Sequence, residues 1–173
     1  MNLQEQTNRI KQMMGVINEN TYDTLSNHLI GGKYLYHYTL TDNLDSITDE
    51  GLIPRKYPNS YYENGTEGIF LTNSPNLYNA NLPQSLMDVM NDYYENEESL
   101  DTKPIVRLTI DISQLDFNLF DVDDDYKLNQ YKWNKSQGTE DELIESLDIW
   151  GAISYKGTIP PDLIKDITFD YGN

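Results

Sequence analysis

A histidine in an aromatic run is the first candidate for chemistry. His37 lies within residues 34–39, Tyr-Leu-Tyr-His-Tyr-Thr, whose composition favours a β-strand. A neutral imidazole carries one hydrogen-bond donor and one acceptor, which suits a pair of hydroxyl groups on a ligand. A histidine that is simply hydrogen-bonded at a sheet edge is the other interpretation, and the residues alone leave both open.

Arg55 is the second candidate, because the chain contains only three arginines, Arg9, Arg55 and Arg107. The formal net charge is −17, from 12 basic and 29 acidic residues. A phosphate-bearing ligand would need local neutralisation in so acidic a protein, and arginine provides it through a bidentate fork. The other interpretation of Arg55 is a solvated charge on a loop.

The composition limits the classes of function. A length of 173 residues suits one domain with a sizeable core. The chain has no cysteine and two histidines, which excludes disulfides and disfavours a zinc site. The run Asp121-x-Asp123-x-Asp125 lacks the glycine and glutamate of a calcium loop, so we predict no metal site. The acidity repels nucleic acid at long range and indicates either solubility or mimicry of a nucleic acid.

The N-terminal segment, residues 1–20, has a pattern of its own. Ile10, Met13, Met14 and Ile17 recur at helical spacing, which predicts an amphipathic helix. This helix either docks on a partner or packs on the domain of residues 21–173. The sequence of this segment resembles the N-termini of proteins from tailed phages. No signal peptide or long apolar run is visible, so we expect a cytoplasmic protein, in the host cell or virion if phage-encoded, without a membrane partner.

The elements that must position His37 and Arg55 mix strands and short helices without βαβ order. Residues 41–43 read as a cap for a helix that ends at Glu50-Gly51, with Gly51 in the left-handed C′ position. Further strands are predicted at residues 68–72, 105–111, 115–122, 149–155 and 167–171, and further helices at 22–30, 83–94 and 139–147, the last starting with a capping box at residues 139–142. This pattern predicts an α+β domain with a mostly antiparallel core.

Three segments resemble the ADP-ribosyltransferase superfamily. Tyr36-His37-Tyr38-Thr39, with the Gly51-Leu52-Ile53-Pro54 turn, is similar to the first strand and turn of that family. Residues 68–72, Gly-Ile-Phe-Leu-Thr, are similar to a second strand, and residues 159–164, Ile-Pro-Pro-Asp-Leu-Ile, to a C-terminal segment. The resemblance covers residues 34–168. It implies an ADP-ribosyltransferase-like split β-core with short flanking helices.

The resemblance also implies roles for single residues. His37 would bond the adenosine ribose of NAD, Tyr78 would stack on the nicotinamide ring, and Arg55 would hold the phosphates. The whole NAD-binding set that it implies is His37, Tyr38, Thr39, Phe70, Thr72 and Tyr78. Transfer of ADP-ribose from NAD to a protein or nucleic-acid acceptor is then the expected activity. Core packing is the other interpretation of Phe70 and Tyr78.

The catalytic acid of the family has no counterpart at the expected place. A glutamate is expected around residues 150–153, which read Trp-Gly-Ala-Ile, and no glutamate follows Glu145. Glu142 and Glu145 share a helix face, so we predict that Glu145, or else Asp148, enters the site from the helix end. Such a carboxylate would stabilise the cation that forms as nicotinamide leaves.

Two other functions stay open at this point. One is an inactive binding protein on the same fold, either an acidic decoy or a virion-associated protein. The other is an enzyme similar to RNA 2′-phosphotransferases, because residues 151–161 resemble the end of that family. Those enzymes need several arginines with a histidine, and this chain is poor in arginine.

Overall fold

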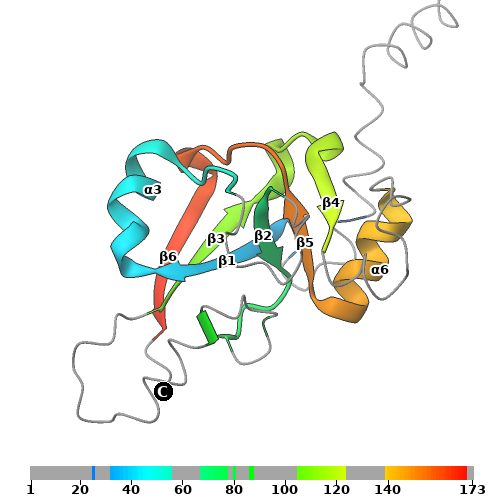
Figure 1. Ribbon diagram of the computed structural model, residues 1–173, viewed down its shortest axis with the longest axis horizontal. Coiled ribbons are helices and arrows are strands. Elements are labelled where there is room, and N and C mark those ends of the chain that lie inside the picture. The colour runs from blue at the N-terminus through cyan, green and yellow to red at the C-terminus, as the bar shows by residue number, and fades with distance from the viewer. Residues whose placement is uncertain are drawn as a thin grey trace, which may run out of the picture.

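The computed structural model describes residues 25, 32–55, 67–77, 80, 86–87, 105–123 and 139–170. These residues form an α+β domain built on one six-stranded antiparallel sheet with a few short helices, as predicted (Figure 1). The predicted N-terminal helix, residues 1–20, lies outside the described residues, as do Tyr78 and most of the predicted helices at 22–30 and 83–94. None of the described helices is long and apolar enough to cross a membrane.

The strand order across the sheet is β4-β5-β2-β1-β3-β6. Helix α3 lies beyond the end of β1 and helix α6 packs against β4 and β5, so the two helices sit at opposite ends of the sheet (Figure 1). The strands are β1 (Tyr34–Leu40), β2 (Ile69–Thr72), β3 (Ile105–Asp111), β4 (Phe120–Val122), β5 (Ala152–Tyr155) and β6 (Ile164–Asp170), and the helices are α3 (Leu44–Glu50) and α6 (Glu140–Trp150).

The sheet is nearly divided between β1 and β2. Strand β1 stays in register with β3 over its whole length, from Tyr34 opposite Asp111 to Leu40 opposite Ile105. Against β2 it has a single registered pair, Tyr36 opposite Thr72. The strands therefore part beyond Tyr36, a feature consistent with the split core that the sequence led us to expect.

Apolar side chains cover both faces of the sheet. Leu35, opposite Ile110, belongs to the main core, which also takes in Ile47 of α3 and Leu147 of α6. Because neighbouring strand residues point to opposite faces, Tyr38 belongs to a second, smaller core with Leu77, Leu86 and Ile105. The two cores pack against the sheet from both sides.

Short-range sequence signals set where several helices and strands begin and end, although some of the predicted bounds were wrong. The predicted capping box is present: Thr139 Oγ1 accepts from the Glu142 backbone N–H, and the Glu142 carboxylate accepts from the Thr139 backbone N–H. Helix α6 runs on to Trp150, so the strand predicted from residue 149 begins only at Ala152. Gly151, with φ 69° and ψ 12°, supplies the left-handed end of that helix.

The start and end of α3 also differ from the prediction. Thr41–Asn43 forms a 3₁₀ turn, and the Asn43 side chain caps nothing but donates to Thr39 Oγ1 at 2.8 Å. Gly51 has a positive φ of 82°, but its ψ of −169° is not that of a left-handed helical cap. Residues 117–119 form a 3₁₀ turn ahead of the short strand β4, and β6 starts at Ile164 rather than residue 167.

Candidate functional site

A pocket of about 340 Å³ opens where β1 and β2 part. Its walls come from the second half of β1, the first half of β2, helix α3 and the turn that follows it. Both faces of the sheet contribute, since His37 and Thr39 point to one face while Tyr38 and Leu40 point to the other. The lining residues are His37–Leu40, Asn43, Ser46, Ile47, Glu50–Ile53, Arg55, Gly68–Phe70 and Leu86.

The turn after α3 is fixed firmly to a distant part of the chain. Leu52 and Ile159 exchange two backbone hydrogen bonds, each of 2.9 Å. A Cβ atom on Gly51 would lie 2.2 Å from the Ile159 carbonyl oxygen, so only glycine fits there. Arg55 follows, and its carbonyl oxygen accepts from the Gly68 N–H at 3.4 Å. These contacts hold Arg55 at the mouth of the pocket, as the predicted turn requires.

His37 spans the gap between the two halves of the sheet. Its Nδ1 lies 2.9 Å from the Phe70 carbonyl oxygen of β2, and because a carbonyl can only accept, Nδ1 carries the hydrogen. Burial lowers the pKa of His37 below its ordinary value of 6.5, against the opposing effect of this hydrogen bond. The imidazole is therefore neutral at pH 7, and its Nε2 lone pair has no partner among the described residues.

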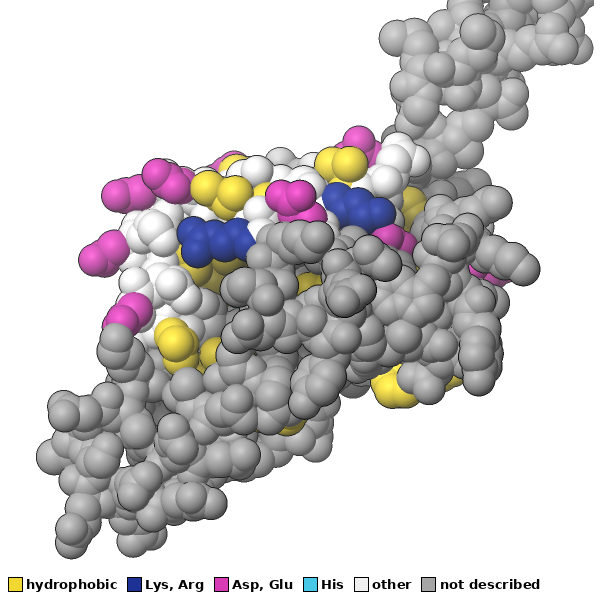
Figure 2. Space-filling model, in the orientation of Figure 1, with side chains coloured by type: hydrophobic (Ala, Val, Ile, Leu, Met, Phe, Trp, Pro, Cys, Tyr) yellow, Lys and Arg dark blue, Asp and Glu magenta, His cyan; other side chains and the backbone are white. Residues whose placement is uncertain are grey.

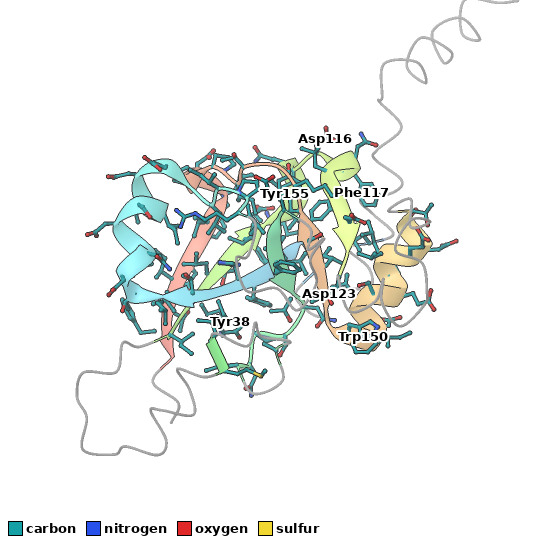
Figure 3. All side chains as sticks on the ribbon, viewed as in Figure 1. Tyr38, Asp116, Phe117, Asp123, Trp150 and Tyr155 are labelled. Atoms are coloured by element: carbon teal, nitrogen blue, oxygen red, sulfur yellow. The ribbon has the colours of Figure 1, made fainter. Side chains whose placement is uncertain are left out.

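Three other predicted ligand-binding residues are engaged in local structure. Tyr38 donates its buried hydroxyl to the Ser74 carbonyl oxygen at 3.2 Å, below β1 in Figure 3. Thr39 Oγ1 accepts from Asn43, and Thr72 Oγ1 accepts from the Ser74 N–H at 3.1 Å. Tyr38 and Thr39 still line the pocket, whereas Thr72 does not. Phe70 lines it from β2.

The predicted acids Glu145 and Asp148 lie away from this pocket. Both are exposed residues of α6, which contacts β4 and β5 at the other end of the sheet, and neither belongs to the lining. The acid that does line the pocket is Glu50, the last residue of α3. The structure thus brings His37, Tyr38, Thr39, Arg55 and Phe70 together and separates them from Glu145.

Helix α3 supplies lining residues that the sequence analysis missed. Ser46, Ile47 and Glu50 lie three, four and seven positions after Asn43, so the four residues share one face of the helix. The apolar pattern of Leu44 and Ile47 alone did not single out this polar face. The exposed side of α3 is acidic, and acidic side chains gather over it at the left of Figure 2.

No family model, curated protein or solved structure matches the chain. In the part of the chain that the structure describes, no group of three or more acidic or histidine side chains could hold a metal ion. Asp121, from the acidic run of residues 121–125, instead pairs with Lys156 at 2.7 Å.

Proposed function

We propose that this chain binds NAD in the pocket between β1 and β2 and transfers ADP-ribose to a macromolecular acceptor. The observation that carries the proposal is the pairing of two groups in one pocket. His37 offers a neutral nitrogen acceptor held in a fixed orientation, and Arg55 offers a guanidinium that no described residue binds. A dinucleotide uses both kinds of group, the acceptor for its ribose hydroxyls and the guanidinium for its phosphates.

His37 suits the hydroxyl groups of a ribose. The hydrogen bond from Nδ1 to the Phe70 carbonyl fixes the ring, so Nε2 can accept from a hydroxyl without further ordering of the side chain. Protonation would turn that acceptor into a donor, and the lowered pKa keeps this from happening at neutral pH. The family resemblance around residues 36–39 agrees with this role.

Arg55 suits the diphosphate. The structure describes four other Lys and Arg side chains, and each has a partner: Lys33 binds Asp111, Lys156 binds Asp121, Lys165 binds the Asp162 carbonyl, and Arg107 binds the Pro75 carbonyl and Thr168. Arg55 alone among them has no such bond. Its two planar N–H pairs match phosphate oxygens, and hydrogen bonds between charged groups are the stronger ones.

The pocket volume of about 340 Å³ falls at the lower end of ligand pockets, which run from about 300 to 1,000 Å³. It accommodates part of a dinucleotide. The RNA 2′-phosphotransferase alternative is weaker, because the described lining contains one arginine and those enzymes require a set of them.

Calorimetry with NAD on the full chain tests the binding part of the proposal. We expect saturable heat below millimolar NAD. His37→Ala should weaken binding by about 1–3 kcal/mol, because a buried polar group of the ligand loses its partner. Thr109→Ala on β3, outside the lining, is the matched control and should leave binding unchanged. No heat from the unaltered protein at millimolar NAD would refute the proposal.

Release of nicotinamide tests the catalytic part. Chromatography of NAD incubated with the protein, alone and with cell lysate as a source of acceptor, should show free nicotinamide. Binding without release under both conditions would make the protein an inactive binding module on this fold. It would leave the assignment of the pocket intact and remove the transferase activity.

A further inference from the structure

The pocket holds two opposite charges that do not neutralise each other. Glu50 and Arg55 both line it, and they are the charged members of the described lining. Neither side chain forms an ion pair or hydrogen bond with another described residue. Both residues are exposed, so both charges are accessible to a ligand that enters the pocket. A carboxylate and a guanidinium that line one pocket suit a ligand that carries both a cationic and an anionic group.

The backbone between them explains why they stay apart. Gly51 lies against the Ile159 carbonyl, and Leu52 is bonded on both sides to Ile159. This anchor fixes Glu50 at the end of α3 and sends Arg55 to the edge of β2, where it meets Gly68. The two charges therefore come from different parts of the pocket lining, Glu50 from the end of α3 and Arg55 from the bridge to Gly68.

We propose that Glu50 is the catalytic carboxylate of this site, in place of the glutamate that the family resemblance led us to expect at residues 150–153 or at Glu145. The inference rests on the proposed binding of NAD. Glu145 belongs to α6 at the other end of the sheet, whereas Glu50 shares the pocket with His37 and Arg55. Glu50 acts on the ribose that carries nicotinamide, while Arg55 holds the diphosphate.

Glu50 acts on the cleavage of the bond between nicotinamide and ribose. The bond between ribose C1′ and the nicotinamide ring nitrogen breaks, and both electrons leave with nicotinamide, which becomes neutral. The positive charge passes to the ribose, where the Glu50 carboxylate stabilises it. An oxygen nucleophile of the acceptor, or water, forms the new bond to C1′ and loses its proton to solvent. A carboxylate paired with Arg55 would have its charge cancelled, so their separation serves this step.

The test compares Glu50→Gln with Asp49→Asn, the preceding exposed acid on the same helix, which does not line the pocket. For Glu50→Gln we expect nicotinamide release at saturating NAD to fall about 100- to 1000-fold, the usual effect of losing one electrostatic stabiliser. Its Kd for NAD should stay within a few-fold of the unaltered protein. Asp49→Asn and Glu145→Gln should release nicotinamide at the normal rate.

The outcomes separate this inference from the proposed function. Normal release by Glu50→Gln would overturn the role of Glu50 and leave NAD binding and turnover standing. Weaker binding of NAD together with a normal rate of nicotinamide release at saturating NAD would also overturn it, since Glu50 would then contribute only to binding. If the unaltered protein binds no NAD, the proposed function fails and this inference fails with it.

Circular dichroism and the melting temperature establish that each variant is folded. Glu50→Asp provides a second, acidic variant that should retain part of the rate of nicotinamide release.

Discussion

Polar side chains serve different purposes beside α6 and at the split between β1 and β2. Within α6, the buried hydroxyl of Ser146 accepts from the Asp123 N–H at 3.0 Å and donates to the Ala152 carbonyl at 2.7 Å. It ties the helix to Asp123, which follows β4 and lies near α6 in Figure 3, and to Ala152, the first residue of β5. At the split between β1 and β2, by contrast, Glu50 and Arg55 face a pocket without described partners.

The two arginines of the described residues show the same difference. Arg107 on β3 donates to the Pro75 carbonyl and to Thr168, and its guanidinium carbon lies 5.4 Å from the centre of the Tyr36 ring. Arg55 is exposed, makes no such contact with a described residue and lines the pocket. Arg107 is therefore engaged in holding the sheet together, whereas the Arg55 guanidinium is accessible to a ligand.

The largest effect should come from closing the space at Gly51. In Gly51→Ala the new methyl group would meet the Ile159 carbonyl oxygen at 2.2 Å and also force a side chain into φ 82°. We expect a loss of more than about 3 kcal/mol in the free energy of unfolding, measured by urea denaturation.

Gly32→Ala is the matched control for that experiment. Gly32 has a similar φ of 69°, but nothing lies within 4 Å of its added Cβ. Gly32→Ala should lower the free energy of unfolding by about 1 kcal/mol, from backbone strain alone. Equal losses in the two variants would show that the contact with Ile159 does not hold the pocket together.

A smaller loss should follow from removing the hydroxyl at the α6 end. Ser146→Ala leaves the Asp123 N–H and the Ala152 carbonyl without their buried partner. We expect about 2–3 kcal/mol in urea denaturation and no change in NAD affinity. Thr48→Ala on the exposed side of α3 should stay within about 0.5 kcal/mol. A change in NAD affinity in Ser146→Ala would contradict the division of roles between the α6 region and the pocket.

Arg55→Gln should have the reverse profile. NAD binding should weaken about tenfold by calorimetry, since one charged hydrogen-bonding group for the diphosphate is lost. Unfolding free energy should stay within about 0.5 kcal/mol, because no described contact is broken. Lys165→Gln removes the same charge from β6 and should leave binding unchanged, so equal effects in both variants would reduce the role of Arg55 to net charge.

The smallest effect concerns pH. Burial lowers the folded-state pKa of His37, so the unfolded chain binds the proton more readily. The resulting stability is present above the ordinary value of 6.5 and is lost as the pH falls through the lower folded-state pKa. Urea midpoints at pH 7.5 and 5.5 should therefore differ more for the unaltered protein than for His37→Gln. An identical pH dependence would mean that His37 is not held neutral.

Local signals in the sequence were sufficient to predict several elements. The aromatic run around His37 and the capping box at Thr139 each depend on neighbours along the chain, and both predictions are confirmed. The strand predicted from residue 149 was wrong at its start, because α6 continues until Gly151 can end it. Gly51 was singled out correctly, but the reason for it, contact with Ile159, is a tertiary one.

The candidate site was predictable in part for the same reason. His37 and Arg55 stood out by residue type and scarcity, and the pocket brings them together. Glu50 was missed because the sequence does not show that β1 and β2 part. Without that parting, nothing marks this face of α3 as part of a pocket. That parting follows from pairing between strands far apart in sequence, which no local pattern encodes.

The bond between Leu52 and Ile159 has a consequence for how the protein is made. The described lining residues all precede residue 87, yet Ile159, which anchors the turn, is synthesised roughly 100 residues after Leu52. At about 5–20 residues per second, roughly 5–20 s pass before Ile159 can join Leu52. During that interval the nascent chain carries His37 and Arg55 without the anchored turn of the folded protein. The proposed binding of NAD should thus begin only after Ile159 has been synthesised.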